Sequence, residues 1–297
     1  MTQITLLDGG MGQELLNRSG DMPTNLWATQ VMLDHPGLVQ AIHGDYFAAG
    51  ATVATSNTYA VHHDRFAGTD FAPRFDEILA IALAAVRTAR DDHGSGRIAG
   101  AIGPLIASYR PDIHPDSERA VPLYAELARA MAPHVDLILG ETVASLAHAD
   151  AILTACAPLG VPVWLAVTVR DSDGAKLRSG EHVGDVIAVA HGRAAALLAN
   201  CSAPEAMPAA IDALLPGDVP VGCYANAFTQ ITEDFLKEKP TVDALSARRD
   251  MGPQTYADHA MDWITQGATI VGGCCETGPA HIAELARRIR AAGHSII

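Results

Sequence analysis

The chain has 297 residues, of which 49% are hydrophobic and only 18% are charged, so it can bury a large core and is not disordered. Its 34 acidic and 20 basic side chains give a formal charge of −14. This excess of negative charge argues against binding to a nucleic-acid backbone or to an anionic membrane surface, because both need a cationic face.

The first residues have neither the basic segment nor the long apolar segment of a secretion signal, and no apolar run approaches the ~20 residues that span a membrane. We therefore expect a cytoplasmic protein that binds small molecules. Its oligomeric state does not follow from the sequence. Disulfides are rare in the cytoplasm, so the five cysteines call for a metal, catalytic or packing explanation.

Short apolar segments alternate along the chain with longer segments of helical period. The predicted strands, in chain order, are residues 4–10, 51–59, 97–104, 135–142, 161–169, 195–202, 219–226 and 269–275. The helices predicted to follow them are residues 31–49, 74–92, 119–132, 143–157, 184–193, 204–215, 255–266 and 279–292.

Most of the predicted strands are almost continuously apolar, as parallel strands covered on both faces are. Eight strand–helix units in a chain of this length predict an α/β fold of the (β/α)8 TIM-barrel type, with residues 1–297 forming a single domain. A doubly wound open sheet is the alternative, although it usually has fewer strands.

The links that follow the strands differ in length from those that follow the helices. Four strand-to-helix links are long, at residues 11–30, 60–73, 105–118 and 227–254, and the helix-to-strand links are short. Long loops in a compact domain are usually functional, and barrel active sites lie at the carboxyl ends of the strands. The sequence therefore places the active site at that end.

Four cysteines fall at the ends of the last three predicted strands: Cys201, Cys223, Cys274 and Cys275. Neighbouring strand ends in a barrel would bring these thiols together, and clustered thiols in a reducing compartment predict a zinc site. The alternative is that the cysteines are small core residues, which is the interpretation we give to Cys156.

The segment Gly272-Gly-Cys-Cys-Glu-Thr-Gly-Pro-Ala-His-Ile282 resembles the zinc-dependent homocysteine S-methyltransferase family. The resemblance extends over most of the chain. Matching segments, in order, are Leu6-Leu-Asp-Gly-Gly-Met-Gly12, Leu26-Trp27, Asp34-His-Pro36, Ala49-Gly50-Ala51, Thr55-Ser-Asn-Thr-Tyr59, Gly140-Glu-Thr142 and Ala199-Asn-Cys-Ser202.

The resemblance implies that Cys201, Cys274 and Cys275 are the three ligands of a catalytic Zn²⁺, with a fourth position open to the sulfur of homocysteine. Metal binding would favour the thiolate of a thiol whose ordinary pKa is about 8.5. Cys223 is not a ligand in the family pattern. Nearby, Ala225 replaces the family's proline and Phe228 stands where a small residue is expected.

Asp8 and Glu141 lie at predicted strand ends, and the resemblance implies that they bind the ammonium group of homocysteine. The alternative is that they are solvated carboxylates, or carboxylates that cap a helix. Gly9 and Gly10 would let the backbone approach the substrate, because glycine has no side chain.

Trp27 and Tyr59 suit a cationic methyl donor, which is attracted to an aromatic face, although core packing explains them equally well. Thr55 and Asn57 either bind the carboxylate of the amino acid or cap a loop.

The function predicted from these residues is methyl transfer from a sulfonium donor, S-methylmethionine or S-adenosylmethionine, to homocysteine, giving methionine. A sulfonium donor is favoured because Thr142 follows Glu141 where betaine-using members have tyrosine. The alternatives are a betaine or corrinoid donor, methylation of another thiol or a selenol, and a non-catalytic barrel that senses zinc or redox state.

Overall fold

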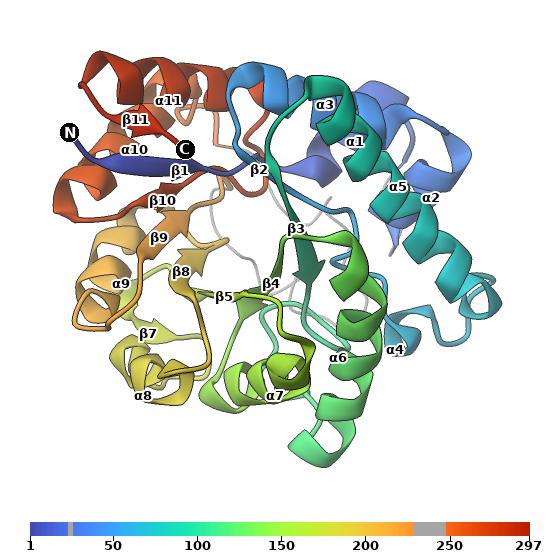
Figure 1. The fold of residues 1–297 in the computed structure, drawn as a ribbon. Helices are drawn as coiled ribbons and strands as arrows, with labels where there is room; N and C mark the ends of the chain where they lie inside the picture. Colours follow the sequence, from blue (N-terminus) through green and yellow to red (C-terminus); the bar gives the residue numbers. More distant parts are fainter. Residues whose placement is uncertain (23–25, 229–247) are drawn as a thin grey trace.

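The computed structural model describes residues 1–22, 26–228 and 248–297, with the side chain of Trp27 also left undescribed. Within these ranges, eight parallel strands form the centre of the molecule and the helices surround them (Figure 1). The strands are β1 (Gln3–Leu6), β2 (Val53–Thr55), β3 (Arg97–Ile102), β4 (Leu137–Val143), β5 (Val163–Val167), β8 (Ala196–Asn200), β9 (Val221–Tyr224) and β10 (Ile270–Val271).

The sheet closes into a barrel. Its strand order is β11-β1-β10-β9-β8-β5-β4-β3-β2, and β1 pairs with both β10 and the short C-terminal strand β11 (Ser295–Ile296). A parallel bridge between Leu7, just after β1, and Val53 in β2 closes the barrel. At the same junction the amide of Thr52 donates to the carbonyl of Leu6 at 2.7 Å. The (β/α)8 barrel predicted from the sequence is confirmed.

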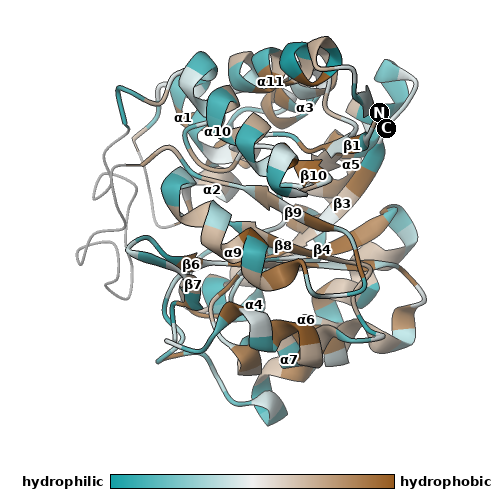
Figure 2. Ribbon diagram, turned by 90° about the vertical axis from the view of Figure 1, so that its left-hand side faces the viewer, coloured by the Kyte–Doolittle hydropathy of each residue, from teal (hydrophilic) through white to brown (hydrophobic). Residues whose placement is uncertain are grey.

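Two apolar cores hold the barrel together. The inner core fills the barrel and includes Leu7, Val53, Leu139, Leu198 and Tyr224. The outer core lies between the strands and the helices, and it is much larger. In Figure 2, hydrophobic residues are concentrated in the strands and hydrophilic residues lie on the outer faces of the helices.

Helices follow most of the strands, as predicted. The α-helices are α1 (Met11–Ser19), α2 (Trp27–Asp34), α3 (Leu38–Ala49), α4 (His63–Phe66), α5 (Phe75–His93), α6 (Ser117–Met131), α7 (Leu146–Cys156), α8 (Val186–Ala190), α9 (Met207–Leu214), α10 (Pro253–Gln266) and α11 (Pro279–Ala291). Short 3-10 helices are η1 (Ala72–Arg74), η2 (Ala132–His134), η3 (Ala157–Leu159), η4 (Val183–Asp185) and η5 (Pro204–Ala206). No helix in the described ranges is both long enough and apolar enough to cross a membrane.

The helix predicted at residues 31–49 is wrong, because two helices, α2 and α3, cover this region. The break falls at His35-Pro36-Gly37, where proline disfavours a helical residue before it and Gly37 has φ +90°. The predicted loop at residues 11–30 contains α1 and the start of α2, and the helix predicted at 184–193 is shorter.

A two-stranded hairpin, β6 (Val169–Arg170) and β7 (Asp173–Leu177), follows β5 and was not predicted. The strand predicted at residues 269–275 is shorter, because regular strand structure is limited to Ile270–Val271. The following residues still contact both neighbours, since the amide of Gly273 donates to the carbonyl of Asp8 and that of Cys274 to the carbonyl of Ala225. Most of the loop predicted at residues 227–254 lies outside the described residues.

Candidate metal centre and active site

Three cysteine sulfurs meet at the carboxyl end of the barrel. Those of Cys201, Cys274 and Cys275 lie within 4.8 Å of one another, with separations of 2.9, 3.7 and 4.0 Å. Cys201 directly follows β8, and the other two form the turn after β10. Tetrahedral Zn–S bonds of about 2.3 Å place sulfurs roughly 3.8 Å apart, a value that two of the three separations approach, and three thiols are a donor set that suits zinc.

The three thiols are electrostatically unequal. The thiols of Cys274 and Cys275 and the hydroxyl of Tyr109 hold the pKa of the Cys201 thiol well below its usual value, because they donate hydrogen bonds to its thiolate. The pKa values of the Cys274 and Cys275 thiols are raised, chiefly because each donates a hydrogen bond to the charged sulfur of Cys201, and their partial burial adds to the rise. The cluster therefore carries its negative charge on Cys201, and a cation would neutralise it.

Cys223 does not join this cluster, which corrects the expectation that four thiols converge. It lies inside β9, fully buried, and belongs to the outer core between the strands and the helices. Its neighbour Tyr224 faces the barrel interior instead, because successive strand residues alternate between faces. Burial alone raises the pKa of the Cys223 thiol, as it raises that of Cys156 to about 12.

Two carboxylates lie on the interior side of the same barrel end. Asp8 is 3% exposed and Glu141 is 8% exposed. Burial raises the pKa of Asp8 to about 7 and that of Glu141 to about 8, and the Asp8 charge contributes to the rise at Glu141. A positive charge between two desolvated carboxyl groups would favour their charged forms.

Each carboxylate is held by a partner from another strand, Asp8 from β2 and Glu141 from β9 on the other side of β5 and β8. Asp8 accepts from the backbone amide of Thr55 at 2.7 Å and from its hydroxyl at 2.9 Å. Glu141 accepts from the hydroxyl of Tyr224 at 3.0 Å. Thr55 is therefore engaged with Asp8.

The remaining predicted site residues contact other parts of the protein. Asn57 donates its side-chain amide to the carbonyl of Ala28 in α2 at 3.2 Å. Tyr59 shares a hydrogen bond of 2.7 Å with Ser108, and its ring lies under the guanidinium of Arg65. The prediction for Trp27 concerns a side chain outside the described residues.

Gly9 and Gly10 bring the loop after β1 against the cysteine turn. A Cβ added at Gly9 would lie 2.2 Å from the carbonyl oxygen of Thr277, and one at Gly10 would lie 2.6 Å from that of Cys274. No other residue fits at these positions without a shift of the backbone that carries the thiols.

The strained residues of the chain also gather at this end. Among the described residues, five that are not glycine have positive φ: Ile106, Tyr109, Thr142, Cys201 and Glu276. Thr142 is the second-last residue of β4, and the other four lie in the segments that follow β3, β8 and β10. Such conformations cost energy and are concentrated at functional sites.

Sequence reasoning missed Tyr109, Tyr224 and Asn200. Tyr109 donates to the sulfur of Cys201 at 2.9 Å, and Asn200 accepts from the amide of Thr142 at 3.0 Å. Asn200 lies in the segment Ala199-Asn-Cys-Ser202 that resembles the family, Tyr224 directly follows Cys223, and Tyr109 lies in the long loop after β3. Their positions were visible in the sequence, but their contacts depend on the closure of the barrel.

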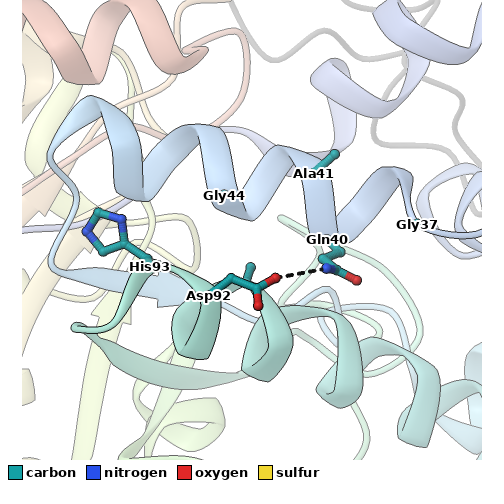
Figure 3. Close-up of a pocket in the computed structure, with 7 residues that line it drawn as sticks. Gly37, Gln40, Ala41, Gly44, Asp92 and His93 are labelled. Atoms are coloured by element: carbon teal, nitrogen blue, oxygen red, sulfur yellow. Dashed lines mark hydrogen bonds between the residues drawn. The ribbon is translucent and has the colours of Figure 1, made fainter.

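A hollow in the surface between α3 and α5 is a separate feature (Figure 3). Gln40 and Asp92 contact each other across it at 3.4 Å. None of the cysteines and none of the predicted site residues lines it. We therefore assign the candidate site to the barrel end.

Comparison with known proteins identifies the family of this chain. The family model described as homocysteine S-methyltransferase matches residues 5–289. The chain belongs to the homocysteine S-methyltransferase family. A homocysteine S-methyltransferase of Escherichia coli is 30% identical, with 96% of this chain and 95% of that protein aligned. Homocysteine S-methyltransferase YbgG of Bacillus subtilis is 25% identical, with 95% and 93% aligned.

Solved structures of the family agree with the fold. The metallated form of the E. coli homocysteine methyltransferase MmuM superposes with a TM-score of 0.80 at 28% identity, covering 96% of both chains. Its apo form gives a TM-score of 0.73 at 26% identity. A member of the family has thus been solved with metal, and this chain has three clustered thiols that could hold a metal ion.

Proposed function

We propose that this protein transfers a methyl group from a sulfonium donor, S-methylmethionine or S-adenosylmethionine, to the sulfur of homocysteine, giving methionine. The observation that carries the proposal is the three-thiol cluster beside two buried carboxylates, in a chain of this family. We also propose that residues 1–297 form one homocysteine-binding barrel domain.

Cys201, Cys274 and Cys275 would hold a Zn²⁺ ion. When bound, zinc would favour the thiolate of homocysteine near neutral pH. Three protein ligands leave one position open, which is the usual arrangement of a catalytic zinc. The proposal fits a reducing compartment such as the cytoplasm, where thiols stay reduced.

Asp8 and Glu141 would bind the ammonium group of homocysteine. Their desolvation is offset when a cation lies between them, and both carboxylates are already oriented, by Thr55 and Tyr224. Binding the ammonium group there would turn the thiol of the substrate towards the three cysteines. A thiol substrate without an ammonium group would leave the two buried carboxylates unpaired.

Methyl transfer itself is a displacement at carbon. The sulfur of homocysteine forms the new S–C bond while the C–S bond of the sulfonium breaks, and the donor leaves as a neutral thioether. The thiol proton goes to solvent. The residues of this chain position the two reactants, and good positioning alone supplies roughly 7–11 kcal/mol in favourable intramolecular reactions.

The test is a panel of methyl donors with homocysteine as the acceptor. It includes S-methylmethionine, S-adenosylmethionine, betaine, dimethylsulfoniopropionate and a methylated corrinoid. Methionine formation with a sulfonium donor, at least tenfold faster than with betaine, is the expected result. Turnover with betaine or the corrinoid alone would overturn the donor assignment, and zinc binding without turnover by any donor would favour a non-catalytic zinc or redox sensor.

A further inference from the structure

Tyr109 contacts the proposed metal centre without belonging to it. Its hydroxyl donates a hydrogen bond to the sulfur of Cys201 at 2.9 Å, and both residues are buried. In the described part of the chain, this is the one hydroxyl that contacts a sulfur of the cluster; Cys274 and Cys275 contact the other sulfurs. The hydrogen bond therefore makes Cys201 different from the other two.

The backbone of the loop after β3 is strained in order to present this hydroxyl. Ile106 and Tyr109 have φ of 64° and 62°, in the left-handed region that bulky residues avoid. The loop is held in place by two side chains: the carboxylate of Asp64 accepts from the amide of Ile106, and the hydroxyl of Tyr124 accepts from the amide of Leu105. Strain maintained by such contacts indicates a position that has been selected for function.

One face of the Tyr109 ring carries a cation. The guanidinium carbon of Arg178, which follows β7, lies 5.3 Å from the ring centroid of Tyr109. Asp171 pairs with Arg178 at 3.1 Å and also accepts from the amide of Ala203 at 2.9 Å, two residues after Cys201. The β6–β7 hairpin thus contacts both the donor and the segment that carries the acceptor.

A cation on the face of a phenol withdraws electron density from the ring, which strengthens the O–H group as a donor. A hydrogen bond to a charged acceptor is shorter and stronger than one between neutral groups. Both effects act on the sulfur of Cys201, and each lowers the electron density available on that sulfur for attack on carbon.

Three ligand thiolates compete with homocysteine for the methyl group. If Cys201 reacted, its sulfur would form an S–CH₃ bond as the C–S bond of the sulfonium broke, and the donor would leave as a neutral thioether. The methylated cysteine would lose its negative charge, and thiolates rather than thioethers are the usual zinc ligands. An enzyme of this kind must direct methylation away from its own ligands.

We propose that Tyr109 is a positioning residue of the metal centre, whose hydrogen bond fixes the sulfur of Cys201 and lowers its nucleophilicity so that the methyl group goes to the substrate. The inference rests on the proposed function. Arg178 supports Tyr109 by its contact with one face of the ring.

The experiment uses the full-length, zinc-loaded protein treated with iodomethane in the absence of homocysteine and donor. Each cysteine sulfur that reacts gains a methyl group and releases iodide, and peptide mass spectrometry gives the rate at each position. Tyr109→Phe keeps the ring and removes the hydroxyl. Tyr46→Phe is the matched control, because it removes a buried hydroxyl that contacts a backbone carbonyl, that of Thr277, rather than a sulfur or the loop that carries Tyr109.

In Tyr109→Phe, which should retain one zinc per chain, we expect Cys201 to be methylated about tenfold faster, the factor that corresponds to about 1.4 kcal/mol in a barrier. Cys274 and Cys275 should change less than about twofold on the same scale. Tyr46→Phe should leave all three rates unchanged. If Tyr109→Phe does not hold zinc, Arg178→Met tests the inference instead. We expect it to accelerate methylation of Cys201 two- to threefold, which is roughly a third to a half of the free-energy effect expected for Tyr109→Phe.

An unchanged rate at Cys201 in a zinc-loaded Tyr109→Phe protein would overturn the inference, as would equal acceleration at all three cysteines, which would indicate a structural role. Iodomethane replaces both substrates, so the readout does not depend on turnover. A protein that fails the donor panel but shows the Cys201-specific change would contradict the proposed function, whereas turnover with unchanged Cys201 reactivity would contradict only the inference about Tyr109.

Discussion

The five cysteines of this chain occupy two regions with opposite properties. Cys201, Cys274 and Cys275 share the carboxyl end of the barrel, where their sulfurs lie within 4.8 Å of one another. Cys156 and Cys223 are packed in the outer apolar core, where burial raises the pKa of both thiols. The comparison shows that the surroundings set by the fold, rather than the residue type, decide which thiols can bind metal.

The largest effect should come from the cluster. Cys201→Ser and Cys274→Ser each remove one of three proposed ligands, so we expect loss of bound zinc and at least a 1000-fold loss of turnover, roughly 4 kcal/mol or more in the barrier. Zinc content by mass spectrometry of the intact protein and methionine formation measure the two losses. Cys223→Ala is the control: one zinc per chain and near-normal turnover are expected, with some loss of stability from the small cavity.

The second effect concerns the acidic pair. Asp8→Asn keeps the shape of the side chain but removes its charge, so we expect the KM for homocysteine to rise about 100-fold, as for loss of about 2.7 kcal/mol of charge-assisted binding. Zinc content should not change. Thr55→Val, which removes one of the two donors to Asp8, should raise KM less, by about tenfold. An unaltered KM in Asp8→Asn would mean that the ammonium group binds elsewhere.

The third effect compares two glycines. Gly9→Ala would put a Cβ 2.2 Å from the carbonyl oxygen of Thr277, so we expect a loss of about 2–4 kcal/mol in unfolding free energy. Gly44, in α3, has no atom within 4 Å of an added Cβ, and Gly44→Ala should gain about 0.5–1 kcal/mol. Urea unfolding measures both. Equal effects of the two substitutions would show that the β1 loop does not need its close approach to the cysteine turn.

The smallest effect is a pH dependence in the scaffold. His43 in α3 is fully buried, neither ring nitrogen has a hydrogen-bond partner, and burial lowers its pKa to about 3. Between about pH 6.5 and pH 3 the unfolded chain binds a proton at His43 that the folded chain does not. Stability from this residue is therefore present above pH 6.5 and is lost as the pH falls, by at most about 1.4 kcal/mol per pH unit.

His43→Leu should reduce the slope of unfolding free energy against pH by the contribution of one proton, at most about 1.4 kcal/mol per pH unit. Urea unfolding of wild type and variant at pH 7, 6 and 5 gives the two slopes. Parallel curves would show that His43 is not the residue that binds the proton on unfolding.

The barrel could be predicted from the sequence because its strands are continuous apolar segments and its helices have a regular period. The ligand cysteines could be predicted because Cys201, Cys274 and Cys275 follow strands that a barrel makes neighbours. The resemblance to the family added their roles, together with those of Asp8 and Glu141.

The contacts of the site were harder to predict. Cys223 was expected at the rim because it is near a strand end, but a shift of one residue along a strand moves a side chain to the other face. Tyr109 reaches Cys201 only through a strained loop, and positive φ at a tyrosine has no sequence signature. The β6–β7 hairpin, which carries Arg178 towards Tyr109, has too few residues to form a periodic pattern.

The central claim is that homocysteine binds at the three-cysteine cluster with its own sulfur as a further ligand of the metal. X-ray absorption at the zinc edge of the zinc-loaded protein measures the number of sulfur ligands directly. The account predicts three sulfur ligands in the free protein and four when homocysteine is saturating, with no increase when methionine replaces it. A count that stays at three with bound homocysteine would contradict the account.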